Sequence, residues 1–380
     1  MLLSHVKQAI LFPRLILILS LFLLFSSPTH ALETVFITGF SPPTFGADTD
    51  SVVLMSIDNG ASWALQDSVF NLRETRSVVA LNSTNYFAAG GSSGADPTGY
   101  TFQTGGDSLG QSVSSGLLQS VDAASGTYYT AGATTNQGTV ANPLYYGTIL
   151  KSTDGTNWTT QISSGSKLNA ISAVTDTVAY AVGASGTVQK TTNGTNWSSQ
   201  TTNSNYVLYG VDAVNSTTAY AVGKNGSDGV ILKTTNGTNW STTQTISGIP
   251  LNAISVTPDN PNVAFAVGDG SAILQTTDGS TWSDSGFSTF GGGALSSIYA
   301  VSSTKAYAVG VIGSVAILDG GFWVDISASI PTAYQNYNFT GVSVFTATPI
   351  PEPSTIILSV VAVSVLAIIQ RTRRSAPKPV

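Results

Sequence analysis

The sequence contains no cysteine, and both of its histidines, His5 and His30, lie within the first 30 residues. Without cysteine the chain has no disulfide and no thiol nucleophile. Without histidine beyond residue 30 it has no imidazole base and no zinc site of the His/Cys type there. We therefore predict no catalytic residue of these kinds, no metal site and no cofactor in the main part of the chain.

Charge is also scarce, because only 9% of the 380 residues are charged. Between residues 32 and 350, nineteen acidic residues face eight basic ones, so this part of the chain would repel phosphate groups and we predict no nucleic-acid partner. The basic residues are Arg73, Arg76, Lys151, Lys167, Lys190, Lys224, Lys233 and Lys305. Glycine and side chains with hydroxyl or amide groups dominate instead, which is typical of short strands joined by tight turns.

A repeat ending in tryptophan runs through the sequence. The tryptophans at positions 158, 197, 240, 282 and 323 lie 39, 43, 42 and 41 residues apart. In the well-formed copies the tryptophan follows an apolar strand, a Thr or Ser, and an Asp or Asn close to a Gly. The Asp or Asn can cap backbone N–H groups, glycine accepts a positive φ, and the indole can pack between neighbouring sheets. We assign a structural role to Asp58, Trp63, Asp154, Trp158, Asn193, Trp197, Asn236, Trp240, Asp278, Trp282 and Trp323.

Units of about 40 residues with four short strands are typical of β-propeller blades. In the best-formed unit we expect strands at 168–174, 179–183, 187–191 and 197–200. The segment 35–39 resembles a second strand without a first, and the segment 339–345 a first strand without its unit. Pairing them completes a blade and removes two sheet edges. We predict an all-β fold, a seven-bladed β-propeller over residues 32–348, in which N- and C-terminal strands share one blade.

The N-terminal segment has the pattern of a secretory signal peptide. Lys7 and Arg14 precede the apolar run 15–25, and small residues surround position 31. We expect residues 1–31 to be removed by cleavage between Ala31 and Leu32.

The C-terminal segment, residues 349–380, combines three features. The motif 351–355 begins with Pro351, Glu352 and Pro353, an apolar helix is expected over 356–369, and the basic tail 370–380 contains Arg371, Arg373 and Arg374. Fourteen helical residues span about 21 Å, less than the roughly 30 Å of a bilayer core, so this short transmembrane helix would be a marginal anchor. The segment resembles the PEP-CTERM sorting signal. That resemblance implies a bacterium, processing by an exosortase-type enzyme after transient anchoring at the inner membrane, and delivery to the cell envelope or extracellular matrix.

The turn motif of the repeat resembles the Asp-box, or BNR repeat, of sialidase-type propellers, and the blades are similar to those of photosystem II assembly-factor propellers. A sialidase needs three arginines around the substrate carboxylate. Between residues 31 and 351 the only arginines are Arg73 and Arg76, so sialidase activity is excluded.

A glycosidase of another type would need two carboxylates about 5–10 Å apart. Most aspartates belong to the repeat turns, but four others could meet at the mouth of a central channel: Asp122, Asp212, Asp228 and Asp269. Six tyrosines are candidates for stacking against sugar rings, although packing is the simpler role for them: Tyr128, Tyr129, Tyr145, Tyr146, Tyr206 and Tyr209.

Three functional hypotheses follow. The first is a secreted, non-enzymatic binding or scaffold module of the cell surface or matrix, with exopolysaccharide as the candidate ligand. The second is a propeller that acts like a photosystem II assembly or stability factor. The third is a carbohydrate-active enzyme other than a sialidase. Because the resemblance at the C-terminus is to a signal linked with exopolysaccharide, we favour the first.

Overall fold

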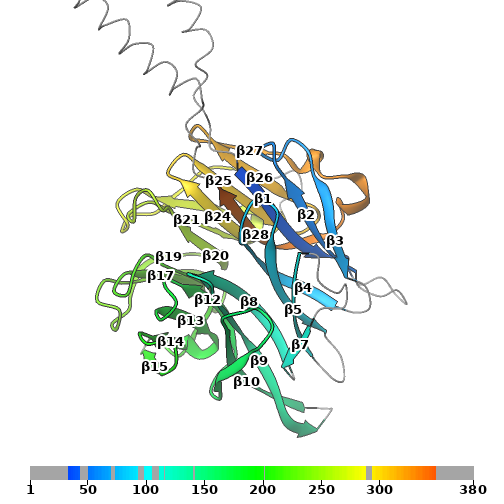
Figure 1. Ribbon diagram of the computed structural model, residues 1–380. Helices are drawn as coiled ribbons and strands as arrows, with labels where there is room; N and C mark the ends of the chain where they lie inside the picture. Colours follow the sequence, from blue (N-terminus) through cyan, green and yellow to red (C-terminus); the bar gives the residue numbers. More distant parts are fainter. Residues whose placement is uncertain are drawn as a thin grey trace, which may run out of the picture. The chain divides into compact units, whose positions relative to one another are not determined.

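The computed structural model describes residues 33–347 apart from 43–49, 70–72, 93–97, 105–110, 115, 140–141, 201 and 288–292. Within these residues the strands form seven antiparallel sheets of four strands each. The innermost strands β28, β4, β8, β12, β16, β20 and β24 contact one another in that order and close a circle. Figure 1 shows the sheets around this circle, so the predicted seven-bladed β-propeller is confirmed.

Each blade runs from its innermost to its outermost strand. Blade 1 contains β28 (Asn338–Thr346), β1 (Glu33–Phe40), β2 (Ser51–Ser56) and β3 (Ala64–Val69). Blade 2 contains β4 (Arg73–Ala80), β5 (Tyr86–Ser92), β6 (Gly99–Gln103) and β7 (Gln111–Ser114). Blade 3 contains β8 (Gly116–Ala124), β9 (Thr127–Thr139), β10 (Asn142–Ser152) and β11 (Thr159–Ser163). Blade 4 contains β12 (Leu168–Ala173), β13 (Ala179–Gly183), β14 (Val188–Thr191) and β15 (Trp197–Gln200).

The remaining blades follow the same plan. Blade 5 contains β16 (Tyr206–Ala213), β17 (Ala219–Asn225), β18 (Asp228–Thr234) and β19 (Ser241–Ile246). Blade 6 contains β20 (Leu251–Val256), β21 (Ala264–Gly268), β22 (Ile273–Thr276) and β23 (Ser283–Asp284). Blade 7 contains β24 (Leu295–Ser302), β25 (Lys305–Gly310), β26 (Val315–Asp319) and β27 (Phe322–Asp325). Short 3-10 turns lie at Ala184–Gly186, Asp269–Ser271, Ser327–Ser329 and Thr332–Tyr334.

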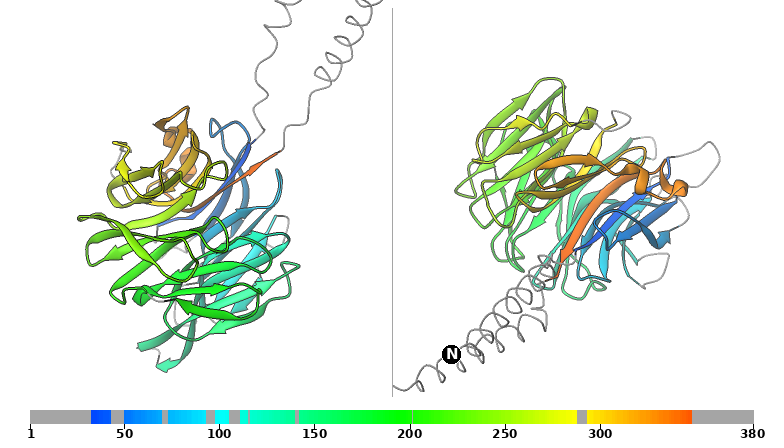
Figure 2. Two further views of the ribbon diagram at one scale, coloured as in Figure 1. Left: turned by 90° about the vertical axis from the view of Figure 1, so that its left-hand side faces the viewer. Right: turned by 90° about the horizontal axis from the view of Figure 1, so that it is seen from above.

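Blade 1 joins the two ends of the propeller. The C-terminal strand β28 pairs antiparallel with the N-terminal strand β1, with Ile37 opposite Val342 and Glu33 opposite Thr346. In Figure 2 the chain colours pass around the ring from blue to orange, and the first and last strands lie together. The predicted shared blade is therefore confirmed, and the innermost strands have no free edge at the closing blade.

Aromatic side chains fill the space between neighbouring blades. Each second strand carries a buried aromatic residue, such as Tyr180 in β13 or Phe265 in β21, because strands in the middle of a sheet are covered on both faces. The tryptophan of the following blade packs edge-on against it. Ring centroids lie 6.0–6.4 Å apart in Tyr129–Trp197, Tyr180–Trp240, Tyr220–Trp282 and Phe265–Trp323. Trp158 packs on Phe87 at 5.7 Å with the two rings tilted by 42°.

The repeat turns share one hydrogen-bond pattern. In the turn after β10, the Gly155 N–H donates to Ser152 Oγ (2.9 Å), and the Thr156 and Asn157 N–H groups donate to Asp154 Oδ1 (2.9 and 2.7 Å). The same side-chain caps occur at Asp58, Asn193, Asn236 and Asp278. These hydrogen bonds hold the pKa of Asp154 and of Asp278 well below the usual range, because they favour the charged carboxylate.

Lysines connect the repeat turns of successive blades. Each donates from Nζ to the glycine carbonyl in the turn of the next blade, and each ammonium lies 4.8–5.4 Å from the centre of a tyrosine ring. The pairs are Lys151 with Gly194 (3.1 Å), Lys190 with Gly237 (3.1 Å) and Lys233 with Gly279 (3.0 Å).

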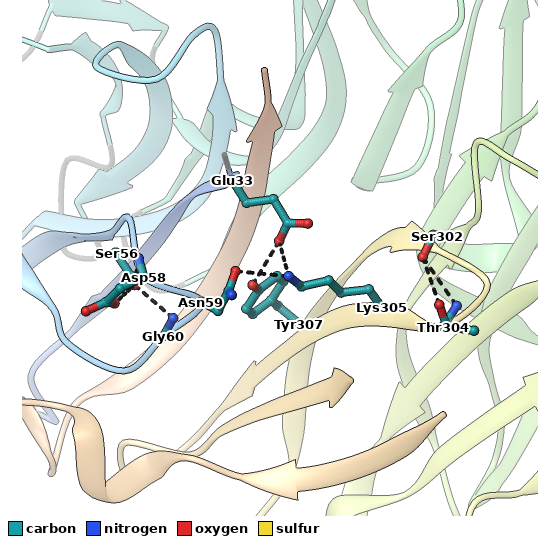
Figure 3. Close-up of polar contacts among 9 residues, drawn as sticks. All are labelled: Glu33, Ser56, Asp58, Asn59, Gly60, Ser302, Thr304, Lys305 and Tyr307. Atoms are coloured by element: carbon teal, nitrogen blue, oxygen red, sulfur yellow. Dashed lines mark hydrogen bonds and ion pairs between the residues drawn. The ribbon is translucent and has the colours of Figure 1, made fainter. Parts of the chain in front are cut away.

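Where blade 7 meets blade 1, this contact becomes an ion pair (Figure 3). Lys305 Nζ lies 2.9 Å from Glu33 Oε2 and donates to Asn59 Oδ1 at 2.9 Å. Tyr307 Oη also donates to Glu33 Oε2 (3.0 Å), and Glu33 is only 8% exposed. The first residue of β1 is therefore fixed to the last blade by a buried charge pair.

The two predicted sorting segments lie outside the described residues. They are the signal peptide 1–31 with its cleavage site between Ala31 and Leu32, and the C-terminal segment 349–380. Among the residues that the structure does describe, no helix is long and apolar enough to cross a membrane.

Candidate functional site

The centre of the ring opens at one end into a polar cavity of about 190 Å³. Its rim takes one residue from the innermost strand of every blade. These seven rim residues are Arg76, Gln119, Asn169, Tyr209, Asn252, Ser296 and Thr340. We call this opening the channel mouth.

A β-bulge places each rim residue. In β12, Leu168 pairs with Gly183 and Ala170 with Val182, so Asn169 between them has no partner on β13. The same skip in register occurs at Arg76, Gln119, Tyr209, Asn252, Ser296 and Thr340. A bulge bends its strand and changes the direction of the extra side chain. Seven equivalent bulges therefore bring seven side chains to one opening.

Glycine on the second strand makes this bulge possible. A Cβ on Gly183 would collide with the backbone carbonyl of Lys167, and one on Gly223 with that of Val207. The glycines at the same register in the other blades meet backbone in the same way: Gly39, Gly90, Gly132, Gly268 and Gly310. The glycine that ends each Ala-Tyr-Ala-Val-Gly strand is thus the sequence signal that could have located the rim, since the rim residue directly follows the residue paired with it.

Hydrogen bonds to the next blade fix several rim side chains. Asn169 Nδ2 donates to the Leu208 carbonyl (2.8 Å), and Asn252 Nδ2 to the Leu295 carbonyl (2.9 Å). Thr340 Oγ1 donates to the Thr75 carbonyl at 2.7 Å. The amide oxygens of both asparagines stay available to a ligand as acceptors, because these bonds use only the nitrogens.

Basic side chains surround part of the mouth. The guanidinium of Arg76 pairs with Glu74, and its Nη1 donates to Gln119 Oε1 at 3.4 Å. Lys167 directly precedes β12, and its pKa is lowered by burial and by the nearby charge of Arg76. Lys224 Nζ lies 5.7 Å from the centre of the Tyr209 ring. The mouth therefore has positive charge on blades 2, 4 and 5.

Deeper in the channel, side chains of the innermost strands accept backbone N–H groups of the next blade. Asp122 Oδ2 accepts from Ala173 (2.8 Å) and Asp212 Oδ2 from Val256 (2.7 Å). Serines do the same elsewhere in this ring: Ser172 for Ala213, Ser255 for Ala300 and Ser343 for Ala80. We call these five residues the acceptor ring.

Both carboxyls of the acceptor ring have raised pKa values. Burial raises the pKa of Asp122 to about 7, with a further contribution from the charge of Asp212, and burial raises the pKa of Asp212 to about 6. Burial and then these two charges raise the pKa of Tyr299 in blade 7 to about 12. The charge of Asp212 thus contributes to the raised pKa of Asp122, and both carboxylates contribute to that of Tyr299.

The four carboxylates singled out in the sequence divide into two groups. Asp122 and Asp212 lie on the innermost strands of blades 3 and 5, where each accepts a backbone N–H of the next blade. Asp228 lies in the hairpin between β17 and β18 and accepts the Gly248 N–H (2.9 Å), while Asp269 is exposed and accepts Asn252 Nδ2 (3.1 Å). The expectation that all four could meet at the mouth is therefore not met, because Asp228 and Asp269 lie at the connections between the second and third strands of blades 5 and 6.

Among the candidate tyrosines, the structure brings Tyr209 to the mouth. Tyr129 is buried against Trp197, Tyr128 packs on Phe87, and Tyr206 Oη lies 3.1 Å from Thr242 Oγ1. The side chain of Tyr145 is outside the described part of the structure. The residues of the repeat turns are not among those described as lining the channel mouth.

A second, open hollow of about 690 Å³ lies at the outer edge of blades 6 and 7. Phe287, Phe322 and Trp323 line it, and Phe322 is 77% exposed. It forms beside β23, which is only two residues long. We call it the outer hollow.

No known family model matches this sequence, and none of the curated proteins matches it. Solved structures with a similar fold include a protein from Lactobacillus plantarum, with a TM-score of 0.57 and 11% identity over 83% of this chain and 99% of that one. A protein from Bacteroides uniformis, described as a proposed 6-phosphogluconolactonase, has a TM-score of 0.53 and 9% identity over 83% and 100%. YCF48 bound to D1 peptide has a TM-score of 0.49 and 14% identity over 74% and 94%. At these identities the likeness shows the propeller fold alone.

Proposed function

We propose that this protein is a non-enzymatic binding module whose ligand is an extracellular polysaccharide, held at the channel mouth. The observation that carries the proposal is the set of seven bulges, one in each blade, which direct seven side chains to one opening. A bulge interrupts the pairing of its strand, and bulges that re-aim side chains are frequent next to functional sites.

The chemistry of the rim suits a sugar. Amide and hydroxyl groups of Gln119, Asn169, Asn252, Ser296 and Thr340 can donate to and accept from sugar hydroxyls. The Tyr209 ring offers a flat apolar face beside them. The cavity is smaller than the roughly 300–1,000 Å³ pockets that enclose drug-sized ligands, so it suits one unit or the end of a chain rather than a long segment.

The carboxylates of the channel support binding rather than hydrolysis. A glycosidase needs one carboxyl to protonate the leaving group and a second to attack or to activate water. Asp122 and Asp212 both accept backbone N–H groups of the next blade and lie below the rim. Their contacts are those of residues that join blades, and we therefore propose no catalytic role for them.

The terminal segments support an exported location. We propose that residues 1–31 direct secretion and that residues 349–380 anchor the chain transiently at the inner membrane, where an exosortase-type enzyme would process it on its way to the envelope or matrix. N-terminal sequencing of the exported protein should begin at Leu32. Full-length protein that stays in the cytoplasm would contradict this part of the proposal.

The photosystem II alternative depends on the resemblance of the blade sequences to those of assembly-factor propellers. The structural similarity to YCF48 shows only a shared fold. No contact in the described residues favours it over polysaccharide binding. Fractionation of the source cells tests it, since an assembly factor would accompany photosynthetic membranes.

An array of immobilised polysaccharides tests the binding proposal. Purified protein should bind at least one glycan, and Tyr209→Ala should weaken this binding by about tenfold, since an aromatic contact of up to about 1.5 kcal/mol is lost. Tyr206→Ala is the matched control, because Tyr206 lies on the same strand and is not among the residues lining the mouth. Absence of binding to every glycan would refute the proposal, and so would equal loss in the two variants.

A further inference from the structure

We propose that the channel mouth selects an acidic saccharide, a sugar unit with a free carboxylate, which Arg76, Lys167 and Gln119 would hold. This inference rests on the proposed polysaccharide function and names its ligand class. Four observations lead to it: where the cations lie, which donors have no partner, which acidic groups near the rim are already bound, and what the surrounding acidic surface allows.

The basic residues whose side chains the structure describes fall into two groups, according to the end of the blades at which they lie. Lys151, Lys190, Lys233 and Lys305 all bind oxygen atoms at the repeat turns, so their charge is used in joining blades. At the opposite end of the strands, Arg76 lines the mouth, Lys167 precedes β12 within the influence of the Arg76 charge, and Lys224 lies beside the ring of Tyr209. In a chain with a formal net charge of −6, this grouping makes the mouth a local positive site.

Two buried donors at the mouth lack acceptors. Arg76 Nε and Gln119 Nε2 have no hydrogen-bond partner within the described residues, although both side chains line the cavity. An unsatisfied buried donor costs about 1–3 kcal/mol, and more when it belongs to a charged group. A ligand that brings oxygen acceptors to this spot would satisfy both donors. A carboxylate does so best, because it offers two oxygens and only accepts.

Lys167 adds an ammonium group with no ion pair among the described residues. It lies close enough to Arg76 for the two charges to repel each other, which an anion between them would relieve. Two acidic groups beside rim residues are already bound: Glu74 pairs with Arg76, and Asp269 accepts from Asn252 on blade 6. The carboxylate should therefore sit toward blades 2 to 4, and the neutral part of the sugar toward Tyr209 and Asn252.

The acidic surface limits how much of a polyanion can approach. Between residues 32 and 350, nineteen acidic residues outnumber eight basic ones, so a long, highly charged chain would be repelled away from the mouth. A short oligosaccharide or a chain end avoids this repulsion. We therefore expect recognition of one uronic acid unit rather than of an extended polymer.

The test compares trigalacturonate with its methyl ester, which keeps the sugar rings and hydroxyls but carries an uncharged methyl ester in place of each carboxylate. Isothermal titration with the purified full-length protein should show at least about tenfold tighter binding of the acid, since a hydrogen bond to a charged group contributes about 1.5–3 kcal/mol. The preference should shrink in Arg76→Gln and in Lys167→Gln, and Lys167→Arg should keep it. Lys151→Gln is the matched control, because it removes the same charge at the other end of the blades.

The outcomes separate this inference from the function on which it rests. Equal binding of the acid and the ester would overturn the carboxylate preference and leave saccharide binding intact. An acetylated triaspartate peptide that bound as tightly as trigalacturonate would overturn the saccharide class of the ligand. Equal loss of the preference in Lys151→Gln and Lys167→Gln would show a general charge effect and overturn the assigned site.

Discussion

The two carboxyls of the acceptor ring should make this propeller less stable as the pH rises from 5 to 8. In an unfolded chain an aspartate has a pKa near 3.8, whereas the folded protein raises that of Asp122 to about 7 and that of Asp212 to about 6. The folded state therefore binds these protons more tightly than the unfolded state. Its free energy of unfolding is highest where both carboxyls are protonated and falls as the pH rises through the folded pKa values.

The size of the effect follows from the two shifts. The folded pKa of Asp122 lies about two pH units above pH 5, and that of Asp212 about one unit above it. Each unit corresponds to about 1.4 kcal/mol in free energy of unfolding. The wild-type protein should lose about 4 kcal/mol in free energy of unfolding between pH 5 and pH 8. Asp122→Asn keeps an oxygen acceptor for the Ala173 N–H and cannot ionise, so its loss over the same range should be only about 1 kcal/mol.

Urea unfolding at pH 5, 6, 7 and 8 measures this directly. Between pH 5 and pH 8 the pH dependence of stability reports on these two carboxyls, because no histidine lies beyond residue 30 and the aspartates of the repeat turns titrate below the usual range. Asp154→Asn is therefore the control, and it should leave the dependence between pH 5 and 8 unchanged. Stability that stayed flat or rose with pH in the wild type, or an unchanged slope in Asp122→Asn, would refute the reasoning.

Three further changes test the structure by urea unfolding. Gly183→Ala should cost at least about 2 kcal/mol, because the new methyl group would overlap the Lys167 carbonyl; Gly165→Ala, which has open space around it, should cost less. Trp282→Ala should cost about 3–5 kcal/mol by removing the ring contact with Tyr220, and Trp282→Phe should restore part of the lost stability. Lys305→Met should cost about 3 kcal/mol by leaving Glu33 buried without its ion pair, and adding Glu33→Gln should restore part of the loss.

Much of the fold could be predicted because the repeat is strong. The tryptophan spacing predicted the blades. The two incomplete units at 35–39 and 339–345 predicted the shared blade that β1 and β28 form. Blade 2 was harder to recognise, since it lacks the tryptophan, and its last strand β7 (Gln111–Ser114) follows residues outside the described part.

The channel mouth was missed, because its residues share a place in the register and not a residue type, and the second-strand glycines that mark this place were interpreted only as small strand residues. Arg76, Asn169 and Tyr209 have nothing in common as side chains, and only the bulge aligned with a second-strand glycine relates them. The electrostatic influence of Asp212 on Asp122 was hidden for a similar reason. Their interaction depends on blades 3 and 5 facing one channel, which spacing along the chain does not show.

Hydrogen–deuterium exchange of the full-length protein with and without trigalacturonate tests the central claim most directly. If the seven bulges form the ligand site, saccharide should slow exchange in residues 166–170, 207–210 and 250–253, which carry or adjoin the rim residues of blades 4 to 6. Protection confined to the outer hollow around Phe322–Asp325 or to the repeat turns, with no change at the mouth, would contradict it.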